Sequence, residues 1–371
     1  VLALAFSGRL GSWRWWMALT RAQWAATLGL LPLLLALGLP VSASGPLANL
    51  LAVPWVSLTV PFALLGTLLL PLAGVGEALL SVVGYSLALL FDVLAAIANW
   101  QPAWIAVGLP VWALALIGLG VLLLLLPAGI PLRSLGLLLL LPLVFPPRVE
   151  VPDGRAQVWV LDVGQGLAVL VRTREHALLY DAGPKQGDFD TGERVVVPSL
   201  RTLGVTRLDL LLLSHADNDH SGGADAVQRL LRVDRVVSGE PSRLAPDLGA
   251  EHCESGSSWQ WNDVRFSLWQ WQMARDSNQQ SCVLQIEANG ERILLTGDID
   301  QAAERAWLAS EQRTPSHWLL LPHHGSRSSS SEPFLRGVAS HAALISRSLH
   351  NAFGHPHPSL VERLDHAWVW V

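Results

Sequence analysis

Two long stretches in the first 150 residues contain no ionisable side chain. The first runs from Ala22 to Gly76 and the second from Val93 to Leu132. A helix needs about 20 apolar residues to cross the ~30 Å hydrocarbon core of a bilayer, whereas shorter apolar runs suffice for the core of a soluble domain. These segments are also too long and too numerous for a signal peptide. The sequence therefore predicts a membrane domain.

We expect spanning helices at about 21–39, 47–72, 76–98 and 103–126, with a shorter fifth candidate at 132–146. The second segment contains Pro54 and Pro61, and each proline removes a backbone donor. Two interpretations stay open there: a kinked helix, and a helix broken beside a pore or cavity.

Basic residues predict the orientation of this membrane domain. Arg9, Arg14 and Arg21 precede the first predicted span, and Arg133 follows the fourth. Because loops rich in Arg and Lys stay in the cytoplasm, we expect this side to be cytoplasmic. If the fifth segment crosses the membrane, the second part of the chain lies outside the cytoplasm.

Charge divides the chain near residue 150. Residues 151–371 hold 20 of the 25 basic residues, 27 of the 30 acidic residues and all 12 His. The net charge of −5 comes from this acidic excess and argues against a generally basic nucleic-acid binder, although basic residues can still gather on one face. We predict a multi-span membrane domain over 1–148 and a second domain over 155–371.

Short apolar runs bounded by turn residues fill the second part and are typical of strands. We expect strands at 157–163, 167–172, 176–181, 208–214, 233–238, 264–269, 282–288, 291–296, 317–322 and 342–346, and a further strand in the last four residues. Helical patterns lie near 193–203, 223–232, 300–312, 331–338 and 358–366. Two strand-rich blocks, each followed by helices, indicate an αββα sandwich or another layered α/β fold.

The segment from Ser214 to Gly223 carries four side chains that can bind a metal ion. They follow the apolar run 208–213 and are His215, Asp217, Asp219 and His220. Imidazole together with carboxylate suits Zn²⁺ or Mn²⁺, and alternate residues of an extended segment share one face. Because so many ionisable groups would repel one another without a cation, the segment predicts a metal site.

Two later strand ends offer further ligands. Asp298 follows the apolar run 291–296, and His323 and His324 follow the run 317–322. A carboxylate such as that of Asp298 can bridge two cations. Two ions about 3.5–4 Å apart can activate water and stabilise a phosphoryl transition state, so these residues offer a second set of ligands for the same site.

These motifs resemble those of known families. HxDxDHxGG at 215–223, TGD at 296–298 and HHGS at 323–326 are similar to the metallo-β-lactamase superfamily. Residues 161–166 and 351–358, with the membrane stretch 44–54, resemble the ComEC family of DNA internalisation proteins. This resemblance implies a membrane α-helical bundle followed by an α/β metallo-β-lactamase-like αββα sandwich. Since family members have more spans and a further soluble domain, we expect a chain truncated at its N-terminus.

The resemblance also implies a ligand set. The ligands would be His215, Asp219, His220, Asp298 and His324, with Asp217 at a position where many relatives have His. Whether one or two ions bind, and whether they are Zn²⁺ or Mn²⁺, stays open. Asp217, Asp219 and His324 are the expected catalytic residues. A carboxylate would accept a proton from the attacking water, and His324 or His355 would position the phosphate or assist the leaving oxygen.

Supporting residues follow from the same resemblance. Asp181 would orient the ligands from behind. Asp162 and Gln165 lie in a turn that either faces the site or is only structural.

Further residues are expected around the ligands. Ser281 and His323 would lie beside them, and His355 either lines the substrate path or belongs to an ordinary turn. Cys253 and Cys282 can form a disulfide if this part lies outside the cytoplasm, and two buried thiols are the alternative.

The function hypothesis implied by the resemblance is DNA uptake across the inner membrane during natural transformation. A metal-dependent nuclease domain would face the extracytoplasmic side and act on double-stranded DNA. A single strand would pass the membrane, where the first part of the chain contributes to the pore, with other DNA-uptake proteins as partners. Two alternatives stay open. One is a membrane-anchored metallohydrolase of another phosphodiester or ester without transport. The other is a channel whose second domain binds DNA without catalysis, which would not require so complete a ligand set.

Overall fold

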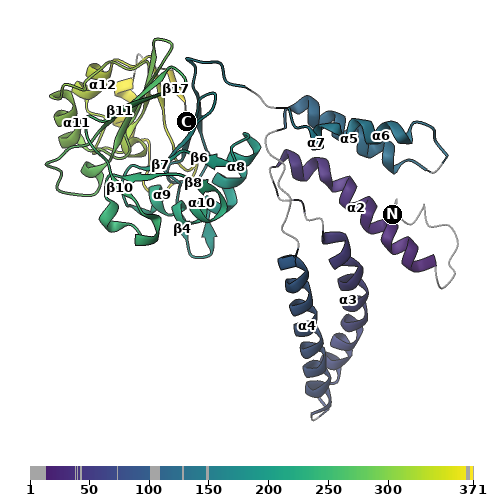
Figure 1. Ribbon diagram of the computed structural model, residues 1–371. Coiled ribbons are helices and arrows are strands. Elements are labelled where there is room, and N and C mark those ends of the chain that lie inside the picture. Colours follow the sequence, from purple (N-terminus) through teal and green to yellow (C-terminus); the bar gives the residue numbers. More distant parts are fainter. Residues whose placement is uncertain are drawn as a thin grey trace. The chain divides into compact units, whose positions relative to one another are not determined.

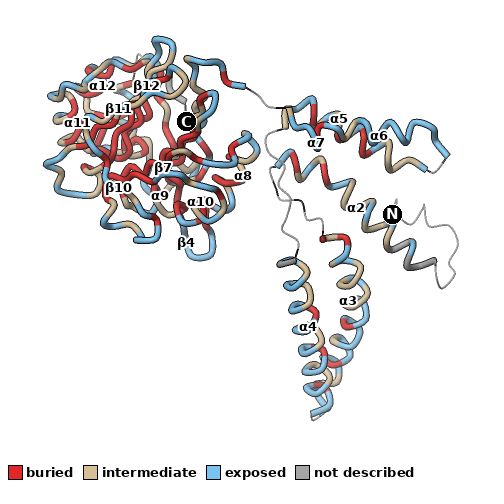
Figure 2. Tube along the Cα trace, in the orientation of Figure 1, coloured by how far each residue is buried: buried red, intermediate tan, exposed pale blue. Residues whose placement is uncertain are grey.

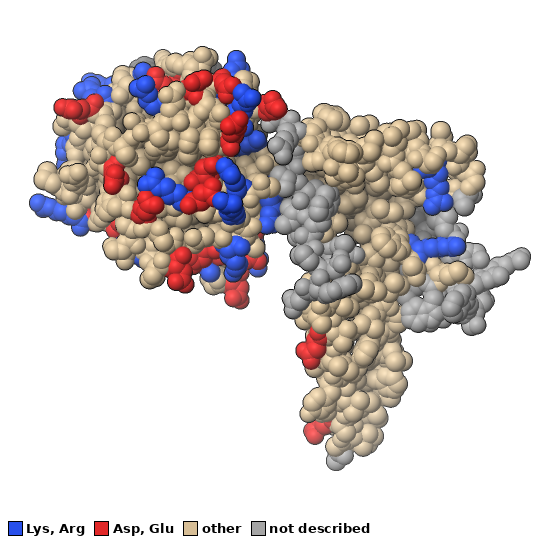
Figure 3. Space-filling view, in the orientation of Figure 1, with Lys and Arg blue, Asp and Glu red and all other residues tan. Residues whose placement is uncertain are grey.

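The structure is a computed structural model that describes residues 14–37, 39, 41, 44–72, 74–100, 109–127, 129–147, 150–364 and 368–370. The chain divides into two compact units, Val1–Arg148 and Val149–Val371. Charged side chains are scattered over the visible face of the second unit, whereas that of the first is almost free of them (Figure 3). The change in composition near residue 150 therefore coincides with a change in structure.

The first unit is helical. Its described helices are α2 (Arg14–Ala36), α3 (Gly45–Leu68), α4 (Val75–Trp100), α5 (Val111–Leu125), α6 (Arg133–Leu139) and α7 (Leu141–Val144). Helix α3 and residues 75–98 of α4 are long and apolar enough to cross a membrane. These two helices pack side by side (Figure 1), and Trp55 Nε1 donates to Ser86 Oγ over 2.9 Å between them. Their outer surfaces are largely exposed within the unit (Figure 2), as expected of surfaces that meet lipid.

The helices of the structure differ in several details from the spans that the sequence predicts. Arg14 and Arg21 lie inside α2 rather than before the first helix. The predicted span 103–126 is helical from Val111, and its residues 103–108 lie outside the described part of the chain. The segment 132–146 divides at Leu140, because Pro142 cannot donate a backbone hydrogen bond to the preceding turn. Helices α5, α6 and α7 are each shorter than the ~20 residues that a membrane-spanning helix requires.

Helix α3 continues through both of its prolines. Pro54 and Pro61 lie inside the helix Gly45–Leu68, so the interpretation as a broken helix is wrong. The prolines remove two intrahelical hydrogen bonds without ending the helix.

Helices α5 and α6 approach closely at two glycines. A Cβ atom on Gly136 would lie 2.7 Å from Gly120 O and 2.8 Å from Leu124 Cγ. The substitution Gly136→Leu is therefore expected to destabilise this helix pair by about 1–3 kcal/mol through overpacking. The melting temperature of the detergent-solubilised chain measures the effect. Gly118→Leu is the matched control, because a Cβ there has no neighbour within 4 Å. Equal melting temperatures for both variants would contradict the close packing.

The second unit contains two large sheets. The first has the strand order β1-β2-β3-β7-β9-β10 and the second the order β11-β12-β13-β14-β15-β16-β17. The strands of the first sheet are β1 (Gln157–Val160), β2 (Val169–Arg172), β3 (Ala177–Tyr180), β7 (Leu210–Leu213), β9 (Val236–Ser238) and β10 (Glu251–His252). Those of the second are β11 (Ser258–Trp261), β12 (Val264–Trp269), β13 (Val283–Ala288), β14 (Glu291–Leu295), β15 (Trp318–Leu320), β16 (Ala342–Leu344) and β17 (Trp368–Trp370).

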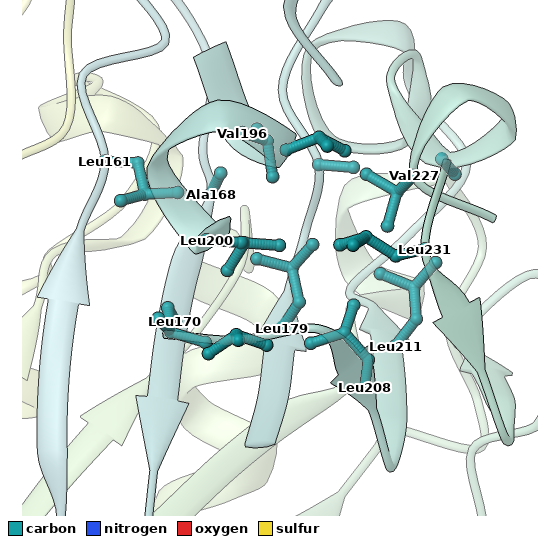
Figure 4. Packing of buried hydrophobic residues seen from close by; sticks show 14 of the residues in the cluster. Leu161, Ala168, Leu170, Leu179, Val196, Leu200, Leu208, Leu211, Val227 and Leu231 are labelled. Atoms are coloured by element: carbon teal, nitrogen blue, oxygen red, sulfur yellow. The ribbon is translucent and has the colours of Figure 1, made fainter. Parts of the chain in front are cut away.

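Helices cover the outer face of each sheet, and three hydrophobic clusters hold the layers together. Because side chains alternate along a strand, Leu178 of β3 packs between the sheets and Leu179 packs beneath the helices. Figure 4 shows the outer cluster under α8 (Val197–Thr202) and α10 (Ala224–Leu230). The other outer cluster lies under α11 (Gln301–Leu308), α12 (Glu332–Val338) and α13 (Pro358–Val361). The predicted αββα sandwich is confirmed.

Local departures from the predicted elements occur near turns. Strand β1 ends at Val160 instead of residue 163, and the chain then turns, since Val163 N–H donates to Leu161 O over 3.0 Å instead of to a neighbouring strand. The predicted helix 193–203 begins as a π-helical turn, Gly192–Val196, before α8. Strand β11, which contains Trp259 and Trp261, was not predicted because it carries no long apolar run.

Candidate metal centre

The candidate site is built by loops that follow the carboxyl ends of three strands. Strand β7 leads into residues 214–217 and the short helix α9 (Asn218–Ser221). Strands β14 and β15 are parallel neighbours in the other sheet, so the loops that carry Asp298 and His324 leave it at the same edge. Residues far apart in the sequence, such as Asp219 and His324 with a separation of 105 residues, therefore meet at one edge of the sandwich.

Four predicted ligands form a compact cluster. One ligand atom from each of Asp219, His220, Asp298 and His324 lies within 4.8 Å of the others. His220 Nε2 is 3.2 Å from Asp298 Oδ1, and His324 Nε2 is 3.3 Å from Asp219 Oδ2. Two imidazoles with two carboxylates suit Zn²⁺, Mn²⁺ or iron. We call these four residues the metal cluster.

Hydrogen bonds behind the cluster orient both imidazoles. His220 Nδ1 lies 2.8 Å from Asp181 Oδ2, and His324 Nδ1 lies 2.9 Å from the carbonyl oxygen of Ser346. A proton on each Nδ1 satisfies these acceptors and leaves the Nε2 lone pair free to face the cluster. This arrangement is the one by which metal-binding histidines are usually held.

Buried nitrogen atoms without partners test whether the residues fit a cation. His215 Nε2 and His220 Nε2 are buried and have no hydrogen-bond partner in the described part of the chain. An unsatisfied buried nitrogen is costly unless another group uses its lone pair. A divalent cation would use it, so the donor set fits a metal ion.

The charges of the cluster are strongly coupled. Burial alone would raise the pKa of Asp298, but His220 and His324 hold it well below its usual range. Burial alone would lower the pKa of His220, but Asp298 and Asp181 raise it well above its usual range. His324 behaves in the same way, since Asp298 and a hydrogen bond with Asp219 raise its pKa. The carboxylates are therefore ionised and ready to bind a cation.

Asp217 lies beside the metal cluster rather than in it. Its Oδ1 accepts from Ser277 Oγ over 2.9 Å and lies 3.4 Å from Arg243 Nη2, and its Oδ2 is 3.6 Å from His215 Nε2. The nearby imidazole of His215, supported by Ser277 and Arg243, holds the pKa of Asp217 well below its usual range. His215 and Asp217 thus form a pair of candidate metal ligands next to the metal cluster.

Glu240 connects three loops around this pair. Its buried carboxylate accepts from Ala216 N–H over 3.0 Å and from Ser277 Oγ over 2.5 Å, and it pairs with Arg243. The sequence analysis missed Glu240, Arg243 and Ser277. Glu240 follows β9, the parallel neighbour of β7. The same rule of acids at strand ends that selected Asp298 would have found it.

Removing one acceptor from Glu240 is expected to loosen Asp217. The substitution Glu240→Gln keeps the shape of the side chain but offers one oxygen where two now accept. We expect divalent-ion affinity to fall about 10- to 100-fold, as for other groups that orient ligands. Isothermal titration with Mn²⁺ measures it. Glu251→Gln is the control, because Glu251 pairs with Arg235 on the surface, and an equal loss there would contradict the role of Glu240.

Other predicted residues lie at different distances from the cluster. Ser281 Oγ accepts from Asp298 N–H over 3.1 Å and lies 3.4 Å from His215 Nδ1. His323 Nε2 is 3.9 Å from Asp298 Oδ2, and the ring of His355 stacks on that of His323. These three residues therefore border the site.

The turn at 161–166 acts through its neighbours. Asp162 is exposed and accepts from Gly164 N–H in its own turn, so its described contacts are local. Gln165 Oε1 accepts from Ser348 N–H, and Ser346 Oγ donates to Gly166 O over 2.7 Å. The turn thereby fixes the loop whose Ser346 carbonyl holds His324.

Cys253 and Cys282 form a disulfide, with Cα atoms 6.0 Å apart. The bond lies between the two sheets and adjoins the site, because Cys282 N–H donates to Ser214 O over 2.7 Å. The disulfide links Cys253, which follows β10, to Cys282, which precedes β13. It thereby fixes the segment that contains Ser281 to the rest of the core.

Comparisons with known proteins cover both units. The family model described as metallo-beta-lactamase superfamily matches residues 161–348, and the one described as competence protein matches residues 2–130. "Competence protein ComA" of Neisseria gonorrhoeae is 37% identical over 348 residues, which cover 93% of this chain and 48% of that protein. "Recombination protein 2" of Haemophilus influenzae is 33% identical over 213 residues, which cover 56% of this chain and 26% of that protein.

The chain thus spans about half the length, or less, of these curated relatives. Among solved structures, the metallo-beta-lactamase fold protein YhfI of Bacillus subtilis is similar, with a TM-score of 0.38 and 10% sequence identity. That match covers 57% of this chain and 94% of YhfI.

Proposed function

Because the chain belongs to the metallo-β-lactamase superfamily and carries a competence-protein region before that domain, we propose that it hydrolyses phosphodiester bonds of DNA during DNA uptake across the inner membrane. The observation that carries hydrolysis is the metal cluster of two imidazoles and two carboxylates. The observation that favours DNA as substrate is the similarity to a protein named for competence, which extends over both units.

The residues of the chain divide the work of the proposed reaction. A divalent ion held by the metal cluster would supply Lewis acidity and lower the pKa of water. We assign the ion as Zn²⁺ or Mn²⁺, one or two per chain. Asp181 and the Ser346 carbonyl keep His220 and His324 in the tautomers that bind it.

A proton acceptor lies next to the cluster. Asp217 is ionised at neutral pH, and its Oδ2 is not used by Ser277 or Arg243. This oxygen can take the proton of the attacking water. Arg243, whose guanidinium is half-exposed beside Asp217, can neutralise an approaching phosphate.

The disulfide supports a location of the second unit outside the cytoplasm. Disulfides persist in oxidising compartments and are rare in the cytosol, and Cys253 pairs with Cys282. We propose the extracytoplasmic side of the inner membrane, where incoming DNA would meet the site. Alkaline phosphatase fused after residue 371 should then be active in cells. An inactive fusion of normal abundance would place this unit in the cytoplasm.

DNA cleavage by the detergent-solubilised full chain tests the proposed reaction. With Mn²⁺ and end-labelled linear duplex, we expect cleavage by the parent chain and its loss in His220→Ala. The control Asp247→Asn removes an exposed acid outside the site and should cleave normally. Turnover of bis-p-nitrophenyl phosphate with intact DNA would instead indicate another phosphodiester substrate. DNA binding without any turnover would indicate a binding module.

A further inference from the structure

Three aromatic rings form a series from the protein surface to the metal cluster. Phe353 is 70% exposed, and its ring centroid lies 5.7 Å from that of His355. The ring of His355 is stacked on that of His323, at 6.2 Å and an interplanar angle of 27°. His323 Nε2 in turn lies 3.9 Å from Asp298 Oδ2. We call Phe353, His355 and His323 the ring series.

The loop that presents Phe353 and His355 is fixed by hydrogen bonds. Asn351 Nδ2 donates to the carbonyl oxygens of Ser348 and His355, and Asn351 Oδ1 accepts from His355 N–H over 2.8 Å. Gln165 anchors the start of the loop by accepting from Ser348 N–H. A ring held in this way binds a partner with little further loss of conformational freedom.

The exposure of the Phe353 ring to water costs free energy, and contact with a bound partner would offset this cost. Phe353 leaves most of its surface in water, although apolar surface is stabilised by burial. The exposed ring continues inward as two further rings, with interplanar angles of 39° between Phe353 and His355 and 27° between His355 and His323. A site for lipid tails or aliphatic side chains would not require such a run of ring faces. Flat ring faces near a phosphodiester site match the faces of nucleobases.

We propose that the ring series is a stacking subsite for unpaired bases of a DNA strand whose backbone lies at the metal cluster. This inference rests on the function proposed above and adds the strand state that the site accepts. Bases inside a duplex have both faces covered by their neighbours, so only unpaired or frayed bases can stack on Phe353. The subsite has no preference for base type, because every base has a π-face.

Oligonucleotide binding by the full chain in detergent, with EDTA present, tests the subsite. The probe is a single-stranded oligonucleotide containing 2-aminopurine, whose fluorescence reports stacking, and the same sequence as a blunt duplex is the comparison. We expect Phe353→Ala to weaken single-strand binding about 5- to 150-fold, the range found for base–aromatic stacking. Phe353→Trp should bind like the parent chain. Duplex binding should change little in either variant.

Leu349→Ala provides the matched control, since Leu349 is 76% exposed in the same loop but is not a ring. Single-strand binding that is unchanged in Phe353→Ala, equally weak in Leu349→Ala, or not restored in Phe353→Trp would overturn the subsite. Because binding is measured without metal, the two proposals can fail separately. Phe353-dependent binding by a chain that never cleaves DNA would refute the nuclease and leave the subsite standing.

Discussion

Replacing Asp298 by asparagine is expected to weaken divalent-ion binding more than about 100-fold, since even groups that only orient ligands cost 10- to 100-fold. Asp298 is buried and contacts both imidazoles of the metal cluster, with its Oδ1 3.2 Å from His220 Nε2 and its Oδ2 3.7 Å from His324 Nε2. An amide of the same shape supplies one oxygen and no negative charge. Metal content by elemental analysis and Mn²⁺ titration measure the loss, and DNA hydrolysis should disappear with it.

The same substitution should change how stability depends on pH. Asp298 raises the folded-state pKa of His220 and His324 above the ordinary value of 6.5. Their protonated forms therefore stabilise the chelator-treated protein fully below about pH 6.5, and this stabilisation is lost as pH rises through the raised values. Metal binding needs the neutral imidazoles, so ion affinity rises over the same range.

Melting temperatures of the parent chain should thus fall with pH in EDTA above pH 6.5 and rise with pH in limiting Mn²⁺. In Asp298→Asn both slopes should shrink. The control is Asp247→Asn, an exposed acid outside the site. Undiminished ion affinity in Asp298→Asn, together with parental slopes, would remove Asp298 from the metal centre.

Substitution of Asp181 is expected to separate metal affinity from folding. Its fully buried carboxylate accepts from Ser214 N–H over 2.6 Å, from Ser214 Oγ over 2.8 Å and from His220 Nδ1 over 2.8 Å. Asp181→Asn keeps the shape and tolerates the positive φ of 61° at this position. We expect it to lose about 10- to 100-fold in metal affinity, because the amide can no longer hold both Ser214 and His220.

Asp181→Ala should in addition unfold the domain more easily. It removes every acceptor from a buried network, and breaking such a buried pair typically costs about 3–5 kcal/mol. Urea unfolding of the detergent-solubilised chain measures this loss beside that of Asp181→Asn. If alanine and asparagine destabilised the chain equally and left metal affinity unchanged, Asp181 would be a purely structural residue.

The sequence indicated candidate metal ligands at two strand ends that are followed by an ionisable residue. Asp298 and His324 were identified in this way, and the structure brings both to His220. The rule of acids at strand ends was not applied to Glu240, because its segment carries no neighbouring His or Asp to mark it as chemical. It also gave no weight to Phe353, whose role depends on a ring that lies 5.7 Å away in space.

The membrane part shows where hydropathy stops being sufficient. Apolar stretches identified α3 and α4, but the length of α5 and the division at Leu140 depend on backbone hydrogen bonding around prolines and on helix packing. Composition records only that a segment is apolar. It does not record where a proline interrupts the backbone hydrogen bonds of the helix, or how the segment packs against neighbouring helices.

Residue order alone determined the division of this chain into an apolar and a charged part, and it indicated the layered α/β sandwich and the candidate metal-binding side chains. These properties follow from local composition and from the two-residue period of strands. Tertiary structure alone decided that Asp217 pairs with Arg243 and Ser277 beside the cluster, that Glu240 ties three loops together and that Phe353 leads through His355 to the site. Such contacts join residues far apart in the chain, and their distances are set by how the two sheets and their loops pack.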